Sequence, residues 1–116
     1  MRLKEVYSLC NYYKSLLGME DWKFKITFTD KLSSSDVLGE VDFYSDKKAG
    51  IIRILSSKAA KRQRLPESEY DQEHILVHEL LHCRFTRVHL PNSPSYEEAI
   101  DCTAACIINL RRQLQN

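Results

Sequence analysis

The sequence predicts a single α+β domain, and three features of the 116-residue chain lead to this fold class. Apolar residues recur with the 3.6-residue period of a helix in three separate segments. Between the first and the second of these, shorter segments alternate apolar and polar residues, as half-buried strands do. A chain of this length buries roughly two-thirds of its unfolded surface in one core, so residues 1–116 are expected to form one domain.

The first half of the chain contains one helix and three strands. The helix is predicted over Leu3–Leu17, because apolar residues line one face and Gly18 follows as a stop signal. A strand is predicted over Trp22–Thr29, where aromatic and aliphatic residues alternate with Lys and Thr. A hairpin joins strands Leu38–Tyr44 and Ile51–Leu55, and the nearly continuous apolar run of the second strand predicts burial on both of its faces.

The second half is predicted to hold two helices between loops. Residues 56–68 contain several cations without interleaved aromatic residues, which favours a solvated loop over a nucleic-acid surface. A helix follows over about Glu69–Phe85, and then a loop at residues 87–95. The last helix is expected to run to about Leu114, with Ser95 as its N-cap.

Composition and charge exclude several classes of protein. Seventeen basic residues against sixteen acidic ones give a net charge of +1, which attracts neither nucleic acid nor an anionic membrane. No apolar run approaches the length of a membrane span and the first residues do not resemble a signal peptide, so we expect a cytoplasmic protein. The cysteines form no C-x-x-C pair, which predicts small buried thiols rather than disulfides at Cys10, Cys83, Cys102 and Cys106.

The segment His78-Glu79-Leu80-Leu81-His82 has the pattern H-E-x-x-H and lies within a predicted helix. Residues four apart share a helix face, so His78 and His82 can direct their imidazoles to one Zn²⁺. Glu79 lies beside these ligands without being one, where it can accept a proton from water as a general base. This arrangement is typical of zinc metallopeptidases. The alternative is an accidental grouping of polar residues on a half-buried helix.

A zinc site of this kind needs a third protein ligand and leaves its fourth position to water. We assign the third ligand to Glu97, because Asp101 lies one helical turn further on the same face. From there Asp101 can accept the free ring N–H of a ligand histidine. Glu98 has no such partner in register and is the weaker candidate.

Two other histidines are poorer ligand candidates. His89 stands one residue too late for the pattern H-E-x-x-H-x-x-G-x-x-H, and Phe85 occupies the position where that pattern has glycine. His74 lies eight residues before His82, which is about 12 Å along a helix axis. One ion therefore cannot bind His74, His78 and His82 at the same time. The developing oxyanion or the substrate could be contacted by several side chains that the sequence does not rank: Tyr96, His89, His74 and Arg84.

The motif V-H-E-L-L-H at Val77–His82, followed by E-x-x-x-D at Glu97–Asp101, resembles the gluzincin branch of the zincins. The order of Asp21-Trp22-Lys23-Phe24-Lys25-Ile26, a hairpin and then the motif helix resembles small metallopeptidases of bacteriophages and mobile elements. It is similar, more loosely, to the catalytic domains of repressor-cleaving metallopeptidases, although Ala99 stands where those usually carry a further glutamate.

This resemblance implies a minimal zincin-like domain, with an N-terminal helix, a small mixed sheet, the motif helix and a C-terminal glutamate helix. It also implies zinc-dependent hydrolysis of a peptide or protein substrate, with Glu79 as the base. One alternative is a zinc-binding or zincin-fold interaction protein of a mobile element that does not cut its partner. The presence of Glu79 disfavours it, because a purely structural zinc site needs no base. A metal-dependent nuclease would rest only on the cations of residues 58–64 and on His89.

Overall fold

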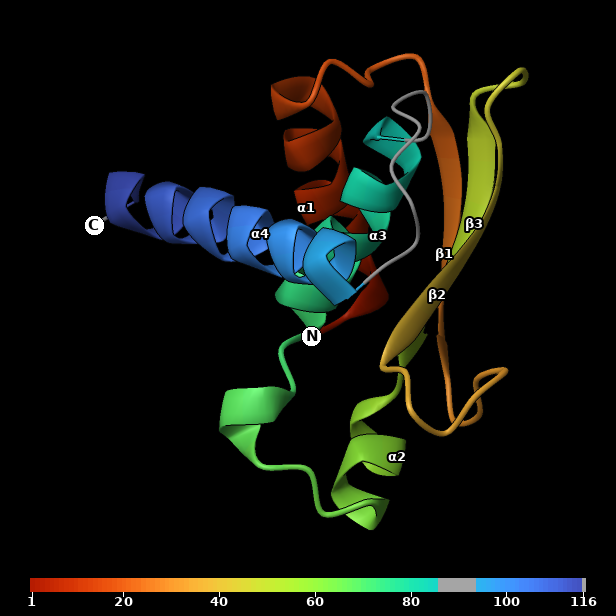
Figure 1. Cartoon of the computed structure of the whole chain (residues 1–116), viewed down its shortest axis with the longest axis vertical. Coiled ribbons are helices and arrows are strands. Elements are labelled where there is room, and N and C mark those ends of the chain that lie inside the picture. Colours follow the sequence, from red (N-terminus) through yellow and green to blue (C-terminus); the bar gives the residue numbers. More distant parts are fainter. Residues whose placement is uncertain (86–93, 116) are drawn as a thin grey trace.

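One helix, three strands and then further helices follow one another along the chain in the computed structural model, which describes residues 1–85 and 94–115 (Figure 1). The predicted α+β class is confirmed: the described residues form four α-helices and one three-stranded sheet. In chain order the elements are α1 (Leu3–Leu16), β1 (Lys23–Thr29), β2 (Gly39–Tyr44), β3 (Ala49–Leu55), α2 (Ser57–Arg62), a 3-10 turn (Glu67–Glu69), α3 (Gln72–Arg84) and α4 (Pro94–Leu114).

The sheet has the strand order β1-β3-β2. Strands β2 and β3 form the predicted antiparallel hairpin, whereas β1 pairs with β3 in parallel. Ile52 in the central strand is aligned with Ile26 on one side and with Val41 on the other, so one face of the sheet carries an apolar row across all three strands. β2 is left as an edge strand of the described sheet.

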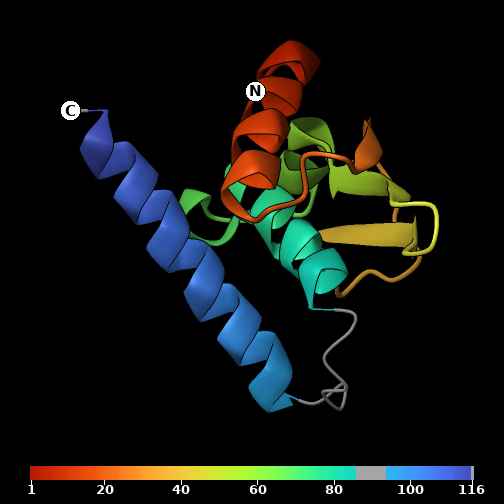
Figure 2. The ribbon, with the colours of Figure 1, turned by 90° about the horizontal axis from the view of Figure 1, so that it is seen from above.

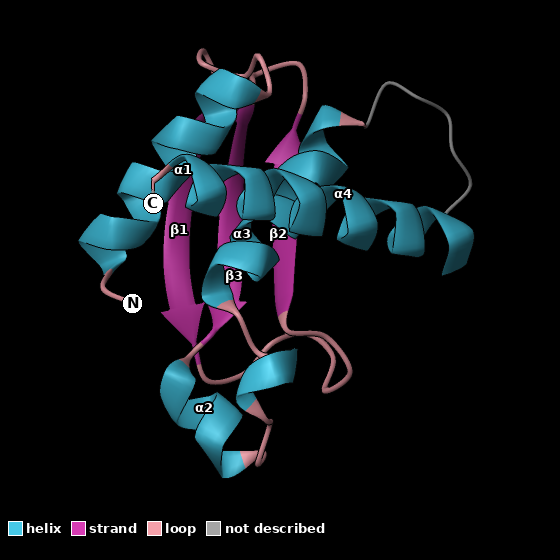
Figure 3. Ribbon diagram, turned by 90° about the vertical axis from the view of Figure 1, so that its left-hand side faces the viewer, coloured by secondary structure: helices cyan, strands magenta, loops and turns pink. Residues whose placement is uncertain are grey.

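Helices cover only one face of this sheet. α1 packs against β1, and α3 packs against β2 and β3, while α4 lies on the outer side of α3 (Figures 2 and 3). Along most of β3 no described helix packs on the opposite face, and Ile51 there is 37% exposed. The expectation that β3 is buried on both faces is therefore wrong for most of the strand. Only at its end are two consecutive residues buried, because Leu55 packs beside Ala59 and Ala60 of α2. On the open face Arg53 pairs instead with Asp42, at 2.6 Å between Nη1 and Oδ2.

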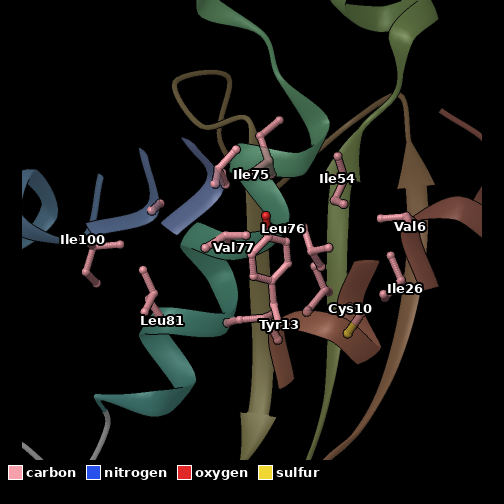
Figure 4. Packing of buried hydrophobic residues seen from close by; sticks show 14 residues of the cluster. Val6, Cys10, Tyr13, Ile26, Ile54, Ile75, Leu76, Val77, Leu81 and Ile100 are labelled. Atoms are coloured by element: carbon pink, nitrogen blue, oxygen red, sulfur yellow. The ribbon is translucent and has the colours of Figure 1, made fainter. Parts of the chain in front are cut away.

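The core lies between the sheet, α1 and α3, and extends outward to α4 (Figure 4). Cys10 and Tyr13 of α1 meet Ile26 and Ile54 of the sheet, and the apolar side chains of α3 fill the space between them. Ile100 of α4 continues this cluster on the far side of α3. α3 is thus a central helix, with neighbours on the sheet side, at α1 and at α4.

The region 56–68 is not the loop that its composition predicts. Ser56 caps the short helix α2, since its side chain accepts a hydrogen bond from the backbone N–H of Ala59. Ala59 and Ala60 are buried beside Leu55, so small apolar residues anchor the helix while its cations stay exposed. A helix of six residues is too short to show a 3.6-residue period clearly.

Two predictions about α4 need correction, and a third concerns residues that are mostly not described. α4 begins at Pro94, so Ser95 lies inside the first turn and is not the N-cap; proline suits this position because its missing N–H has no helical acceptor there. Most of the predicted loop 87–95 lies outside the described residues. Cys102 and Cys106 are exposed rather than buried, because Ile100, Ala104 and Ile108 form the face of α4 that meets the core.

Although α4 has 21 residues, neither it nor any other described helix is long and apolar enough to cross a membrane.

A buried carboxylate joins three helices at the end of α3. Glu73 is 3% exposed and accepts hydrogen bonds from Tyr13 of α1 at 2.6 Å and from Arg111 of α4 at 2.7 and 3.0 Å. Arg112 adds a further bond at 2.9 Å. Burial alone would raise the pKa of Glu73, but the bonds from Arg111, Tyr13 and Arg112 outweigh it and hold the pKa below its usual value. The C-terminal half of α4 is therefore fixed to α3 by charge as well as by packing.

Replacing this carboxylate should destabilise the domain strongly. We expect Glu73→Gln to lower the free energy of unfolding by about 3 kcal/mol, because it leaves the half-buried Arg111 without its counter-charge. Urea denaturation followed by circular dichroism measures the change. The exposed Glu20 provides a matched control, and Glu20→Gln should alter stability by less than about 0.5 kcal/mol. Equal stability of the two variants would contradict the prediction.

Candidate metal centre

Three histidines form the only open side of α3. His74, His78 and His82 follow one another at four-residue intervals and are partly exposed, whereas every other residue of α3 except Arg84 is buried. The helix starts at Asp71, whose side chain accepts hydrogen bonds from the backbone N–H groups of Glu73 and His74. A helix that packs on several sides has no wide polar face, so its imidazoles must emerge along this single stripe.

α4 brings carboxylates to the histidine stripe. Ile100, Ala104 and Ile108 are buried against the core, and this register turns Glu97 and Asp101 toward α3. Residues four apart lie on the same helix face, which accounts for their joint approach. Glu98, one position further round the helix, is exposed and contacts none of the histidines described.

Three potential ligand atoms converge between the two helices. The Nε2 atoms of His78 and His82 are 3.0 Å apart. Glu97 lies between them, with Oε2 at 3.1 Å from His78 Nε2 and Oε1 at 3.2 Å from His82 Nε2. Zinc bonds of about 2.0–2.1 Å in a tetrahedral site place ligand atoms about 3.3 Å apart. The observed spacings are close to this value, so the three side chains fit a zinc ion.

Asp101 fixes the orientation of the first histidine. Its Oδ1 lies 2.6 Å from Nδ1 of His78 and 3.3 Å from Nε2 of His74. Because a carboxylate only accepts hydrogen bonds, this contact assigns the ring proton of His78 to Nδ1 and leaves Nε2 toward the other potential ligands. A carboxylate in this place sets the tautomer of a ligand histidine and makes the ring a stronger donor to metal. His74 reaches Asp101 but lies outside the group of three ligand atoms.

Glu79 is buried beside this group. Its side chain makes no hydrogen bond to any described residue, although the residue is only 6% exposed. Burial, with smaller contributions from Glu97 and Glu40, raises the pKa of Glu79 from 4.5 to about 7, against the opposing effect of His78. A carboxyl group with a pKa near neutrality can both take up and release a proton under physiological conditions.

A cavity of about 270 Å³ opens next to Glu79. Residues 36–39 form one wall, and α3 and α4 form the other with His78 and Glu97 among them. Gly39 is required for this arrangement, because a Cβ atom there would lie 2.3 Å from Cγ2 of Ile75. The close approach of β2 to α3 is the feature of the site that the motif spacing did not reveal.

The remaining candidate contacts divide into two groups. His74 lines the cavity, and the ring of Tyr96 lies 5.5 Å from the ring of His82, edge to face. Arg84 is turned away, since its Nε donates to the backbone carbonyl of Leu17 at 3.0 Å and the residue lines a separate cavity. His89 lies outside the described residues.

The case for a metal centre rests on the chemistry of these donors. Neither a family model, nor a curated protein, nor a solved structure matches the chain. Two imidazole nitrogens and one carboxylate form a donor set that zinc takes in catalytic sites. Burial lowers the pKa of His82 despite the nearby charge of Glu97, so its ring stays neutral, as a metal ligand must be.

The buried carboxyl group predicts a pH-dependent stability of the metal-free protein. Since the pKa of Glu79 is raised from 4.5 to about 7, the folded state binds more protons than the unfolded state within this window. The free energy of unfolding should therefore fall as pH rises from about 4.5 to 7, by about 3 kcal/mol relative to Glu79→Gln. Urea denaturation with a chelator at pH 5 and pH 8 measures it. A stability difference between the two proteins that does not change with pH would refute this expectation.

Proposed function

We propose that this chain is a zinc-dependent peptidase with a minimal zincin-like fold. His78, His82 and Glu97 are the metal ligands, and Glu79 is the general base. The observation that carries the proposal is the convergence of three ligand atoms within 3.0–3.2 Å, next to a buried carboxyl group that lines a cavity. An accidental grouping of polar residues accounts for the histidines but not for the carboxylate of Glu97 placed between them.

In the proposed hydrolysis, zinc and Glu79 have separate roles. A zinc ion in such a site supplies Lewis acidity toward water and toward the carbonyl oxygen of the peptide bond. Glu79 takes a proton from the attacking water as a C–O bond forms at the carbonyl carbon. It then gives this proton to the amide nitrogen as the C–N bond breaks, so that one carboxylic acid and one amine leave.

Neighbouring side chains support this chemistry. Asp101 holds the ring of His78 in one tautomer through the 2.6 Å contact with Nδ1. Tyr96 lies beside His82, and burial raises the pKa of its hydroxyl group, which therefore keeps its proton at neutral pH. Of the candidate donors to the developing oxyanion, Tyr96 and His74 adjoin the site, whereas Arg84 is engaged elsewhere.

The ligand set can be tested by measuring bound zinc. The purified protein should hold one equivalent, and His78→Ala, His82→Ala and Glu97→Gln should each lose it, because two ligands hold zinc far less well than three. Asp101→Asn should weaken the affinity about 10- to 100-fold. Elemental analysis and competition with a chelator provide both readings.

Glu98→Gln is the matched control, since it removes the adjacent carboxylate on the same helix turn. It should keep full zinc occupancy. Zinc loss in Glu98→Gln together with retention in Glu97→Gln would show that Glu98, and not Glu97, is the ligand.

Hydrolysis separates the enzyme from the interaction protein. Glu79→Gln keeps the shape of the side chain and should retain zinc, but it removes the base and should lower the rate about 10²- to 10⁴-fold. Cleavage of unfolded fluorescein-labelled casein measures this rate, and Glu98→Gln should leave it unchanged. If Glu79→Gln supports biological function as well as the wild type does, the protein acts by binding and not by cleavage.

A further inference from the structure

We propose that the cavity beside the metal centre receives a lysine or arginine side chain of the substrate, and that Asp36 recognises its charge. The inference deepens the proposed function, on which it rests, by naming the class of peptide that the site selects. It is drawn from the walls of the cavity, from their charges and from two carboxyl groups that make no hydrogen bond to a described residue.

The cavity has the size of a side-chain pocket. Its volume of about 270 Å³ lies just below the range of about 300–1,000 Å³ that holds whole drug-sized ligands. It adjoins Glu79 and Glu97, so a side chain that enters it belongs to a residue next to the bond that is cleaved. The size and charge of the pocket therefore determine which substrate sequences bind.

One part of the pocket wall is apolar. Val37, Leu38 and Ile75 line it, and Gly39 brings β2 close to α3 at its base. Lysine and arginine carry a chain of three or four methylene groups that packs on such a surface while the charged end reaches a polar group. A short polar side chain would leave these residues uncovered.

The charged part of the wall is entirely acidic among the described residues. Asp36, Glu79, Glu97 and Asp101 line the cavity, and no described lysine or arginine does so. Glu97 and Asp101 are engaged with histidines, which leaves Asp36 as the exposed carboxylate without a hydrogen bond or ion pair to a described residue. A cationic side chain would supply the missing partner.

The backbone holds Asp36 at the rim. Its N–H donates to the hydroxyl of Ser34 at 3.2 Å, and Ser33 donates to the carboxylate of Glu40 at the start of β2. Residues 33–40 thus form a loop closed by its own contacts, and the close packing at Gly39 joins this loop to α3. Asp36 has a defined position relative to the metal ligands.

Glu79 lines the same cavity as Asp36. It is 6% exposed, lines the cavity and makes no hydrogen bond to a described residue. Its carboxyl oxygens are accessible from the cavity, so a polar group of a substrate that enters the cavity can form a hydrogen bond with them. The same cavity therefore offers a place for the reacting group and a place for the neighbouring side chain.

Binding and cleavage of three matched peptides test the inference. The probes are acetylated and amidated hexapeptides of one sequence with lysine, norleucine or glutamate at one central position; norleucine keeps the apolar stem and lacks the charge. Their affinities are measured by NMR titration of the chelated protein, which cannot hydrolyse them, and their kcat/KM values are measured with zinc. The chelated measurement keeps the result independent of activity.

We expect wild-type protein to favour lysine over norleucine about 5- to 10-fold, and norleucine over glutamate. Asp36→Asn should reduce the lysine preference to less than about twofold, and Asp36→Lys should reverse it. Asp46→Lys is the matched control, because it makes the same charge change in the turn at the other end of β2 and should leave the preference intact.

The outcomes separate this inference from the proposed function. Selective binding of the lysine peptide without cleavage by the zinc-loaded protein would support the pocket and overturn the peptidase. Cleavage of all three peptides at equal rates would support the peptidase and overturn the pocket. A lysine preference that survives Asp36→Lys, or no measurable binding of any of the three peptides, would also overturn the pocket.

Discussion

The packing of α4 on α3 is the contact on which the site depends. α3 carries the imidazoles of His78 and His82 and the carboxyl group of Glu79, but the carboxylate of Glu97 reaches them only if α4 crosses with one particular register. The buried side chains of Ile100, Ala104 and Ile108 set this register near the site. Near the C-terminus of α4, the bonds from Arg111 and Arg112 to Glu73 prevent the helix from sliding or turning, since a shift would leave the buried charge of Glu73 without its partners.

The central position of α3 explains both the stability and the chemistry of the domain. A helix covered on several sides contributes its apolar residues to one continuous core, and its few polar groups gather on the uncovered stripe. Burial beside that stripe raises the pKa of Glu79, so ionisation of this carboxyl group at neutral pH lowers the free energy of unfolding. The charges of Glu97 and Asp101 raise the pKa of Glu79 further, and a bound cation would have the opposite effect. Metal binding at this site would therefore stabilise the folded state.

Much of this architecture can be predicted from the sequence because it depends on local periodicity. The 3.6-residue period of α1, the alternation in β1 and the register that turns Glu97 rather than Glu98 toward α3 are all properties of neighbouring residues. The parallel pairing of β1 with β3 is not, since it joins segments that the hairpin separates in sequence. The exposure of Cys102 and Cys106 depends in the same way on which face of α4 meets the core.

Glycine at position 39 shows why the cavity could not be predicted from the motif. The spacing of H-E-x-x-H places three side chains on one helix, but says nothing of which strand approaches that helix. Ile75, one turn before Glu79, reaches so close to β2 that no Cβ fits at Gly39. This contact brings the loop that carries Asp36 to the edge of the metal centre. The placement of Glu79 and the shape of the cavity thus depend on the same close approach, and a larger residue at position 39 would change both.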